Sequence, residues 1–280
     1  MHYSEIPPNG YLARFIECFW MLEGEPADDH CPEPILPDGC VEIILNFGSR
    51  FEEIDQAGDH HLQPRHLLVG QMTRPVLIVP SGRVELIGIR FQPGGTIPFL
   101  RASMQEVVNS VVNLGALSGK LEQELLTSVD RETTLRERVA GLEIALARRL
   151  GEWKQQSQLT NLTASIVRTG GRISVDTLAQ QAATSPRQLR RKFLQEVGIG
   201  PKLLCRLLRF QQVFRAIGGQ DPEWANVAVE CGYYDQAHLI NDFRQFANQT
   251  PAVLLAQNTG LTEAFLRKNR ASVFSNTPAA

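Results

Sequence analysis

Residues 178–201 read LAQQAATSPRQLRRKFLQEVGIGP, and residues 227–251 repeat the same pattern as VAVECGYYDQAHLINDFRQFANQTP. Each copy opens with an apolar residue followed by alanine, and a polar turn then leads into a segment with apolar residues four positions apart. Four positions recur at identical offsets: Leu189, Phe193, Gly198 and Pro201 in the first copy, and Leu239, Phe243, Asn248 and Pro251 in the second. The pattern predicts two helix-turn-helix units, with matching residues 50 positions apart.

The residue types at the recurring positions suit pairs of helices that cross at close range. Ala179 and Ala228 are small enough to let two helix backbones approach each other. Leucine and phenylalanine four positions apart share one helix face, which we expect to face the core. Gly198 and Asn248 are the residue types that tolerate the left-handed conformation at a helix end, and a proline three residues later can begin the next helix.

The second helix of each unit is predicted to carry polar side chains on the face away from the core. In the first unit these are Arg187, Arg190 and Arg191, with Lys192 beside them; in the second they are Gln236, His238 and Asn241, with Arg244 one turn later. Like charges gathered on one short helix are unfavourable alone but favourable beside a polyanion, and Arg, Gln and Asn can bind base edges in the major groove. The alternative is a pair of solvated faces without a partner.

Residues 172–255 resemble the double helix-turn-helix DNA-binding domain of the AraC/XylS transcription regulators. The residues that carry the resemblance are Leu178, Ala179, Ser185, Pro186, Leu189, Arg191, Phe193, Gly198 and Pro201, then Val227, Ala228, Cys231, Gly232, Tyr233, Asp235, Leu239, Phe243, Arg244, Thr250 and Pro251. The resemblance implies that the two recognition helices enter successive major grooves, roughly 34 Å apart. It also implies the base-facing residues: Arg187, Arg190 and Arg191, then Gln236, Ala237, His238 and Asn241. Asn241 stands where the family often has arginine, so we expect the second helix to add less affinity.

Composition is that of a globular protein, and the length suits two domains. The 280 residues are 43% hydrophobic and 21% charged. No apolar run is long enough to cross a membrane, and the first ten residues lack the order of a secretion signal, so we expect no membrane association and a cytoplasmic location. The five cysteines are odd in number and form no CxxC pair, which fits reduced thiols.

The net charge of −2 conceals an asymmetry along the chain. Residues 160–280 hold 14 Lys and Arg against 8 Asp and Glu, whereas residues 1–159 hold 14 against 22. A cationic region joined to an anionic one is typical of a nucleic-acid reader with a separate sensing domain. We therefore predict four segments: a β-rich sensing domain at 1–102, a helical connector at 103–170, the double helix-turn-helix domain at 171–258, and a tail at 259–280.

Five short apolar segments in the first part of the chain predict strands: 15–22, 41–47, 66–70, 76–79 and 84–91. They indicate a β-rich domain, either a barrel or a sandwich. Residues 37–48, together with 88–95, resemble the cupin-like N-terminal domains found on one subset of AraC-type regulators. This resemblance implies a small β-barrel able to hold an effector. The expected fold class is α+β: a cupin-like β-barrel, helices after it, and an all-α C-terminal domain.

Several side chains in the β-rich region could have chemical roles. The candidate metal ligands are His30, His60, His61 and His66, with Glu42 and Asp59, but they do not follow the spacing of a cupin metal site and His60 and His61 fall in a predicted loop. We predict neither a metal nor another cofactor. The three cysteines of this region, Cys18, Cys31 and Cys40, fit a thiol sensor or small core residues.

Arg90 lies on an otherwise apolar strand, next to Pro93-Gly94-Gly95. A buried arginine needs a partner, and a carboxylate effector would supply one. The alternative is an ion pair with an internal acid such as Asp38. Arg90 is therefore the candidate effector-binding residue.

The connector has helical periodicity. A helix from about 131 to 154 has an apolar stripe formed by Leu135, Val139, Leu142, Ile144, Leu146 and Leu150. The stripe fits packing against the β-domain or the next helix, and the resemblance to AraC-type regulators implies a homodimer surface as the alternative. A polar stretch at 155–159 is a candidate hinge, and a second helix at 159–169 ends at Gly170-Gly171. A further helix, at 201–217, is predicted to set the distance between the recognition helices; its Arg206 and Arg209 suit phosphate contacts or pairs with acids.

The sequence thus predicts a sequence-specific transcription regulator that binds double-stranded DNA and is not an enzyme. The resemblance to AraC-type regulators also implies a small-molecule effector in the β-domain, and activation, with RNA polymerase as a partner, more than repression. Two alternatives stay open: a cupin-type metal enzyme with an appended helical domain, and a protein-binding adaptor.

Overall fold

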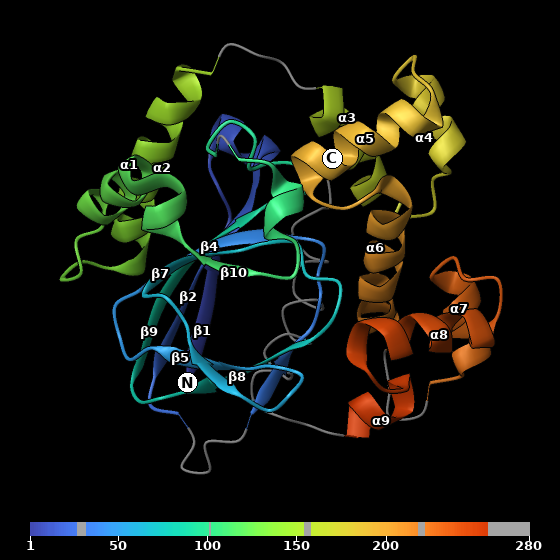
Figure 1. The fold of residues 1–280 in the computed structure, drawn as a ribbon, viewed down its shortest axis with the longest axis horizontal. Helices are drawn as coiled ribbons and strands as arrows, with labels where there is room; N and C mark the ends of the chain where they lie inside the picture. The colour runs from blue at the N-terminus through green and yellow to red at the C-terminus, as the bar shows by residue number, and fades with distance from the viewer. Residues whose placement is uncertain (27–31, 101, 154–157, 218–221, 257–280) are drawn as a thin grey trace, which may run out of the picture.

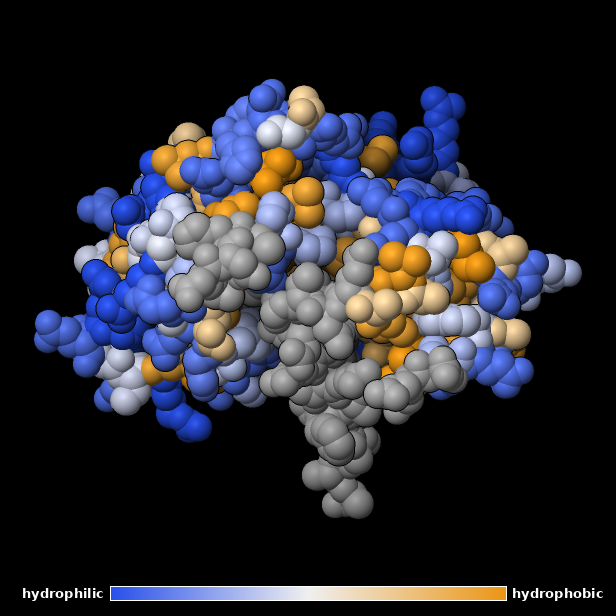
Figure 2. Space-filling model, turned by 90° about the horizontal axis from the view of Figure 1, so that it is seen from below, coloured by the Kyte–Doolittle hydropathy of each residue, from blue (hydrophilic) through white to orange (hydrophobic). Residues whose placement is uncertain are grey.

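The computed structural model describes residues 1–26, 32–100, 102–153, 158–217 and 222–256 (Figure 1). A β-rich region with two helices beside it forms one side of the molecule, and the C-terminal helices form the other. Within the described residues, no helix is long and apolar enough to span a membrane. On the face seen in Figure 2, hydrophilic side chains surround separate hydrophobic patches.

The β-rich region consists of two antiparallel sheets. The first has the strand order β1 (His2–Ile6), β2 (Ile16–Gly24), β9 (Val84–Phe91), β4 (Val41–Asn46), β7 (His66–Val69) and β10 (Val111–Asn113). The second has the order β3 (Glu33–Ile35), β8 (Val76–Pro80), β5 (Phe51–Ile54) and β6 (His60–Leu62). The α+β fold class is confirmed. Among the described residues no strand of one sheet pairs with a strand of the other, so the β-region is not the closed barrel that was expected.

The central strands of the larger sheet are covered on both faces, which explains why β9 is almost wholly apolar. On one face, Phe19, Ile43 and Ile89 join a core completed by helices α1 (Leu114–Ser128) and α2 (Leu135–Gly151). On the other face, Trp20 and Leu86 pack with Phe51 of the smaller sheet. The layers are therefore helices, six-stranded sheet and four-stranded sheet.

Helix α2 shows why the expected apolar stripe was only partly right. Its buried residues are Val139, Leu142, Leu146 and Leu150, which join the core that the larger sheet forms with α1. Ile144 is 63% exposed, because it lies two positions from Leu142 and therefore projects from the opposite side of the helix. The rest of the stripe packs mainly on helix α1, inside the core that α1 and α2 share with the larger sheet, and the homodimer surface stays a prediction. Residues 154–157, which hold most of the predicted hinge, lie outside the described residues.

The C-terminal region is all helical: α3 (Gln158–Arg168), α4 (Val175–Gln181), α5 (Pro186–Val197), α6 (Pro201–Ala216), α7 (Trp224–Glu230), α8 (Gln236–Ala247) and α9 (Pro251–Ala256). These helices share one apolar core, and α3 belongs to it through residues such as Ile166. The predicted connector is thus divided between two cores, with α1 and α2 on the sheet and α3 in the helical region.

The predicted helix ends are confirmed. Gly198 and Asn248 have positive φ angles of 95° and 57°, and the prolines at 201 and 251 each begin a helix. Helix α6 runs between the α4–α5 unit at one end and the α7–α8 unit at the other (Figure 1). With 16 residues, it spans roughly 24 Å at the usual helical rise.

Candidate nucleic-acid interface and ligand cavity

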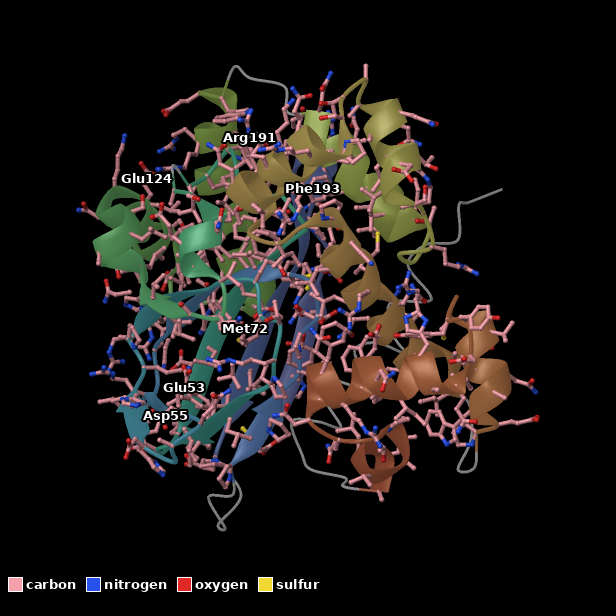
Figure 3. The ribbon with its side chains drawn as sticks, turned by 45° about the vertical axis from the view of Figure 1, so that its right-hand side comes forward. Glu53, Asp55, Met72, Glu124, Arg191 and Phe193 are labelled. Atoms are coloured by element: carbon pink, nitrogen blue, oxygen red, sulfur yellow. The ribbon has the colours of Figure 1, made fainter. Side chains whose placement is uncertain are left out.

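Helix α5 presents the first cationic stripe. Ser185 caps it by accepting a hydrogen bond from the Gln188 backbone, and Gln188 reaches back to the Ser185 backbone, which fixes where the helix begins. Leu189 and Phe193 are fully buried. The four predicted cations, Arg187, Arg190, Arg191 and Lys192, are all exposed, and none forms an ion pair with another described residue. Figure 3 labels Arg191 on this helix, with Phe193 of the inner face beside it.

Helix α8 presents the second stripe. Asp235 caps it by accepting a hydrogen bond from the His238 backbone N at 2.7 Å. Leu239 and Phe243 are fully buried, and the predicted readers Gln236, Ala237, Asn241 and Arg244 are exposed. The α8 stripe is therefore polar with a single arginine, in contrast to the cationic stripe of α5.

His238 is less accessible than the other predicted readers. Its ring is half-buried and meets the ring of Tyr233 edge to face, with centroids 5.1 Å apart. Its Nδ1 accepts a hydrogen bond from the Tyr234 backbone N at 3.5 Å. The side chain of Tyr234 itself is 89% exposed in the turn before α8. Sequence reasoning did not select Tyr234; an exposed aromatic residue beside a recognition helix was the available signal.

Helix α6 holds the two units by aromatic and ionic contacts. Phe210 of α6 packs edge to face on Phe243 of α8, with ring centroids 4.8 Å apart. Arg206 of α6 donates two hydrogen bonds to the buried carboxylate of Asp242, at 2.6 and 3.0 Å. Arg209 donates to the Gly171 carbonyl at 3.0 Å. Arg206 therefore pairs with an acid of α8, and Arg209 links α6 to the turn between α3 and α4.

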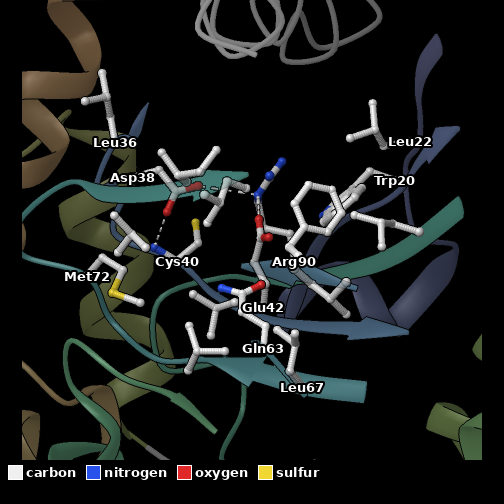
Figure 4. Close-up of a pocket in the computed structure, with 18 of the residues that line it drawn as sticks. Trp20, Leu22, Leu36, Asp38, Cys40, Glu42, Gln63, Leu67, Met72 and Arg90 are labelled. Carbon is white, nitrogen blue, oxygen red and sulfur yellow. Dashed lines mark hydrogen bonds and ion pairs between the residues drawn. The ribbon is translucent and has the colours of Figure 1, made fainter. Parts of the chain in front are cut away.

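A second candidate site lies between the two sheets. It is a cavity of about 180 Å³ with aliphatic walls, three aromatic side chains and three charged ones (Figure 4). The aromatic residues are Tyr3, Trp20 and Phe51, and the charged residues are Asp38, Glu42 and Arg90. Trp20 fits this wall because its indole lies over Gly88, where any Cβ would overlap it. A concave, mostly apolar cavity with a few convergent polar groups is the usual form of a small-molecule site.

Arg90 is held inside this cavity by acids of the same domain. Its side chain is 8% exposed and bonds Glu42, its cross-strand neighbour on β4. Its Nη1 is 3.3 Å from Glu5 and its Nε is 3.5 Å from Asp38. Although burial disfavours the charged guanidinium, attraction to Glu42 and the other negative groups around it keeps the pKa of Arg90 well above its usual value. The internal pairing is the alternative that the sequence left open.

The loop before β4 joins the cavity to the helical region. Leu36 lines the cavity and also belongs to the core of the C-terminal helices. The buried side chain of Gln211, on α6, donates a hydrogen bond to the Pro37 carbonyl at 2.5 Å. Gly39 lies against α6, since a Cβ there would be 3.5 Å from Leu204. Asp38, between these contacts, faces Arg90. One short loop therefore lines the cavity and contacts α6, the helix between the two recognition helices.

The candidate metal ligands do not come together. His60 and His61 lie in strand β6, where a loop was predicted; that prediction was wrong, because their segment pairs with β5. His60 bonds Glu52 at 2.7 Å and His61 bonds Asp55 at 2.9 Å, both on the exposed surface. His30 lies outside the described residues. Within the described part of the chain, no three His, Cys, Asp or Glu side chains converge as a metal site would require.

The cysteines that the structure describes are buried: Cys18, Cys40, Cys205 and Cys231. Burial raises the pKa of the Cys205 and Cys231 thiols to about 11, so these two are protonated at neutral pH. Cys18 and Cys40 lie beside the cavity, where the Cys18 sulfur is 3.5 Å from Arg90. Cys31, the third member of the candidate thiol sensor, lies outside the described residues.

Comparison with known protein families identifies the type of domain that the C-terminal helices form. A family model described as a helix-turn-helix domain matches residues 178–257, the part of the chain that holds both units and α6. The C-terminal region is an AraC-type helix-turn-helix domain. A second model, described as a domain of unknown function (DUF6597), matches residues 4–113, which hold both sheets. The AraC-type domain supports a DNA-binding transcription regulator, a class of proteins that are not enzymes.

No curated protein sequence matches the chain. Among solved structures, ToxT from Vibrio cholerae is similar at 10% identity with a TM-score of 0.48, over 86% of this chain and 99% of that one. ToxT bound to (E)-4-(8-methylnaphthalen-1-yl)but-3-enoic acid is similar at 10% identity with a TM-score of 0.47, over 85% and 98%. Wild-type ToxT from strain SCE256 with a bound unsaturated fatty acid is similar at 11% identity with a TM-score of 0.44, over 86% and 95%.

Proposed function

We propose that the protein is a sequence-specific transcription regulator whose AraC-type domain reads two adjacent segments of duplex DNA. The observation that carries this proposal is the exposure of polar stripes on α5 and α8, at opposite ends of α6. Capping fixes where each recognition helix begins, and burial of the apolar pair on its inner face fixes the orientation of the stripe.

The stripes on α5 and α8 are proposed to make different kinds of DNA contact. Arg187, Arg190 and Arg191 would bind guanine edges or phosphates, and Lys192 a phosphate. Gln236 and Asn241 would bind adenine edges, Ala237 would allow close approach to the groove, His238 would contact a base edge or phosphate, and Arg244 a phosphate. Phosphate contacts would provide salt-dependent affinity, and base contacts the discrimination between sequences.

We further propose that a small molecule in the cavity changes DNA binding through the loop that contains Pro37. Leu36 and Asp38 line the cavity, and the Pro37 carbonyl between them accepts the Gln211 hydrogen bond from α6. A ligand that moves this loop would strain or release its contacts with α6. Because α6 separates the recognition helices, a small change at its surface would alter how well both fit one DNA face.

The regulatory outcome is proposed to be activation through contact with RNA polymerase. We also propose that two copies of the chain form a homodimer. Exposed apolar residues that line a shallow groove at α2, Tyr11 and Ile144, suit a homodimer contact. Transcription in vitro with purified polymerase would separate activation from repression. Light scattering over a range of concentrations would give the oligomeric state.

The central test is selection of bound sites from random double-stranded DNA with the full chain. We expect enriched sequences with two conserved blocks about one helical turn apart. Retarded mobility with the selected site, but not with a scrambled site of equal composition, would support the proposal. Equal binding to both would show a charged surface without sequence recognition, and the function proposed here would be wrong.

A further inference from the structure

We propose that the cavity between the two sheets binds an uncharged, apolar molecule about the size of a substituted benzene ring. This inference rests on the proposed role of the cavity as the effector site and adds the chemical class of the effector. It follows from the pairing of the charged groups that line the cavity, from the composition of its walls and from its volume.

The three charged side chains that line the cavity have partners within the protein. The Arg90 guanidinium bonds the Glu42 carboxylate, and its Nε is 3.5 Å from Asp38. Glu5 adds a third acid, 3.3 Å from the Arg90 Nη1. The Asp38 carboxylate also accepts a hydrogen bond from the Cys40 backbone N at 2.9 Å. The charged groups of the lining are therefore satisfied by one another and by the surrounding fold.

A charged ligand of either sign would disturb this arrangement. An anion could reach the Arg90 guanidinium only by displacing one of its carboxylates, and a cation could reach Glu42 only by competing with Arg90. Breaking a buried ion pair leaves a charge without its partner, and an unpaired charge is costly to move from water into an apolar cavity. An uncharged molecule avoids both losses because it leaves every ion pair intact.

Three polar side chains of the lining are also engaged in hydrogen bonds. The Tyr3 hydroxyl donates to Glu5, and the Cys40 thiol donates to Glu17 at 3.1 Å. The Gln63 side chain donates to an acid of β5 at 3.4 Å. Donors that are already paired offer little to a polar ligand, since each new hydrogen bond would replace an existing one. A ligand with little hydrogen-bonding capacity therefore suits the lining.

Both sheets supply apolar walls. The larger sheet contributes Leu22 and Leu67 (Figure 4), and the smaller sheet contributes Phe51, Val76 and Ile78. Contact with such side chains removes the apolar surface of a ligand from water, which is the main source of affinity for a molecule without charge. The walls therefore favour the same class of ligand as the paired charges do.

The volume of the cavity sets the size of the ligand. It is about 180 Å³, which is below the roughly 300–1,000 Å³ of pockets that hold drug-sized molecules. An engineered apolar cavity of about 150 Å³ in another protein binds benzene. One ring with a short substituent therefore fits this cavity, whereas a molecule with several rings would require its walls to move.

The first test compares three molecules of similar size and different charge. At neutral pH ethylbenzene is uncharged, benzylamine is a cation and benzoate is an anion; titration calorimetry would measure the binding of each to the full chain. We expect ethylbenzene to bind more tightly than either charged compound by a factor on the order of ten or more, because burial of an unpaired charge opposes binding. Equal or tighter binding of benzylamine or benzoate, or no detectable binding of ethylbenzene, would overturn the inference.

A pair of variants on one strand locates the binding. Ile78 lines the cavity, whereas Leu77, its neighbour on β8, is 37% exposed and points to the other face of the strand. Ile78→Phe should fill part of the cavity and weaken ethylbenzene binding by a factor on the order of ten, because a packed site cannot accept extra volume. The matched control, Leu77→Phe, should leave the affinity unchanged.

Circular dichroism would show whether the Ile78 variant folds. If it does not, Val76→Leu fills less of the same cavity and should weaken ethylbenzene binding several-fold. Equal affinity in the cavity variant and the Leu77 control would place the binding elsewhere and defeat the inference.

Gel shifts with the selected DNA, with and without ethylbenzene, keep this inference separate from the proposed function. A protein that binds its DNA but not ethylbenzene would retain the regulator assignment and lose the ligand class. Ethylbenzene binding that leaves DNA affinity unchanged would retain the ligand class for this cavity and remove its proposed effector role.

Discussion

The two helix-turn-helix units have the same skeleton and opposite surface chemistry. Both recognition helices bury a leucine and a phenylalanine four positions apart, and both end in a residue with positive φ. The outer face of α5 gathers four cations, whereas that of α8 has amides, a histidine and one arginine. Packing against α6 constrains only the inner faces. The two copies therefore share the residues that the core requires and differ on the face that would read DNA.

The first prediction tests whether the two units contribute equally to the core that they share. Phe243→Ala should destabilise the helical region by about 3–5 kcal/mol, because it empties a buried site that Phe210 and Phe214 contact edge to face or at a tilt. Phe193→Ala should cost somewhat less, since no described aromatic ring is paired with Phe193. Urea unfolding followed by circular dichroism would measure both, with Tyr234→Ala as an exposed control. Equal losses would show that aromatic pairing adds nothing to the second unit.

The helix ends should respond differently to an exchange of their residues. Gly198 has a φ of 95°, and a Cβ there would lie 2.9 Å from the Met104 carbonyl oxygen in the neighbouring region. Gly198→Asn should therefore cost roughly 2–3 kcal/mol in unfolding free energy. Asn248→Gly should stay within about 0.5 kcal/mol, because Asn248 is exposed and glycine also adopts its conformation. A similar cost for both exchanges would mean that the Met104 contact is unimportant.

The reading surfaces should contribute unequal affinity. Arg191→Ala should weaken binding to the selected site by about 1–3 kcal/mol if it binds a base, and Asn241→Ala should fall at the lower end of that range. Competition gel shifts against sites mutated one base at a time would give both values. Arg136→Ala, which removes an exposed arginine from α2, is the control. Unchanged discrimination between selected and mutated sites would remove Arg191 from the set of reading residues.

The smallest effect concerns salt. If Arg187 binds a phosphate, Arg187→Ala should reduce the slope of log affinity against log salt concentration by about one, uniformly across DNA sequences. Gln236→Ala should leave that slope unchanged because an amide releases no counterion. Fluorescence anisotropy between low and physiological salt would show the contrast. Identical slopes for the two variants would mean that Arg187 makes no phosphate contact.

The β-region was harder to predict than the helical one, for a physical reason. Strands β2, β4, β7, β8 and β9 are apolar and were found within two residues of their ends. Strand β6 reads HHL and is fully exposed, so no apolar signal marks it; only pairing with β5 makes it a strand. Short edge strands such as β3 and β10 depend in the same way on distant partners.

The candidate sites also contain some features that the sequence predicts and others that depend on packing between distant segments. Exposure of the predicted α5 readers follows from helical periodicity once Leu189 and Phe193 are assigned to the core. Periodicity could not foresee that His238 would pack on Tyr233, since this contact depends on how the turn before α8 folds. It also could not foresee the cavity, whose walls come from both sheets.

The two helix-turn-helix units, their ends and their polar stripes follow from the amino-acid sequence alone, because each depends on residues within a few turns of one another. The partners of Arg90, which include Glu5 from 85 positions away, and the contact of Gln211 with Pro37 across 174 positions depend on the packing of distant segments. Such contacts form when separate elements pack, and burial then selects the partner. Local patterns can show that a buried arginine needs an acid, but not which acid the fold brings to it.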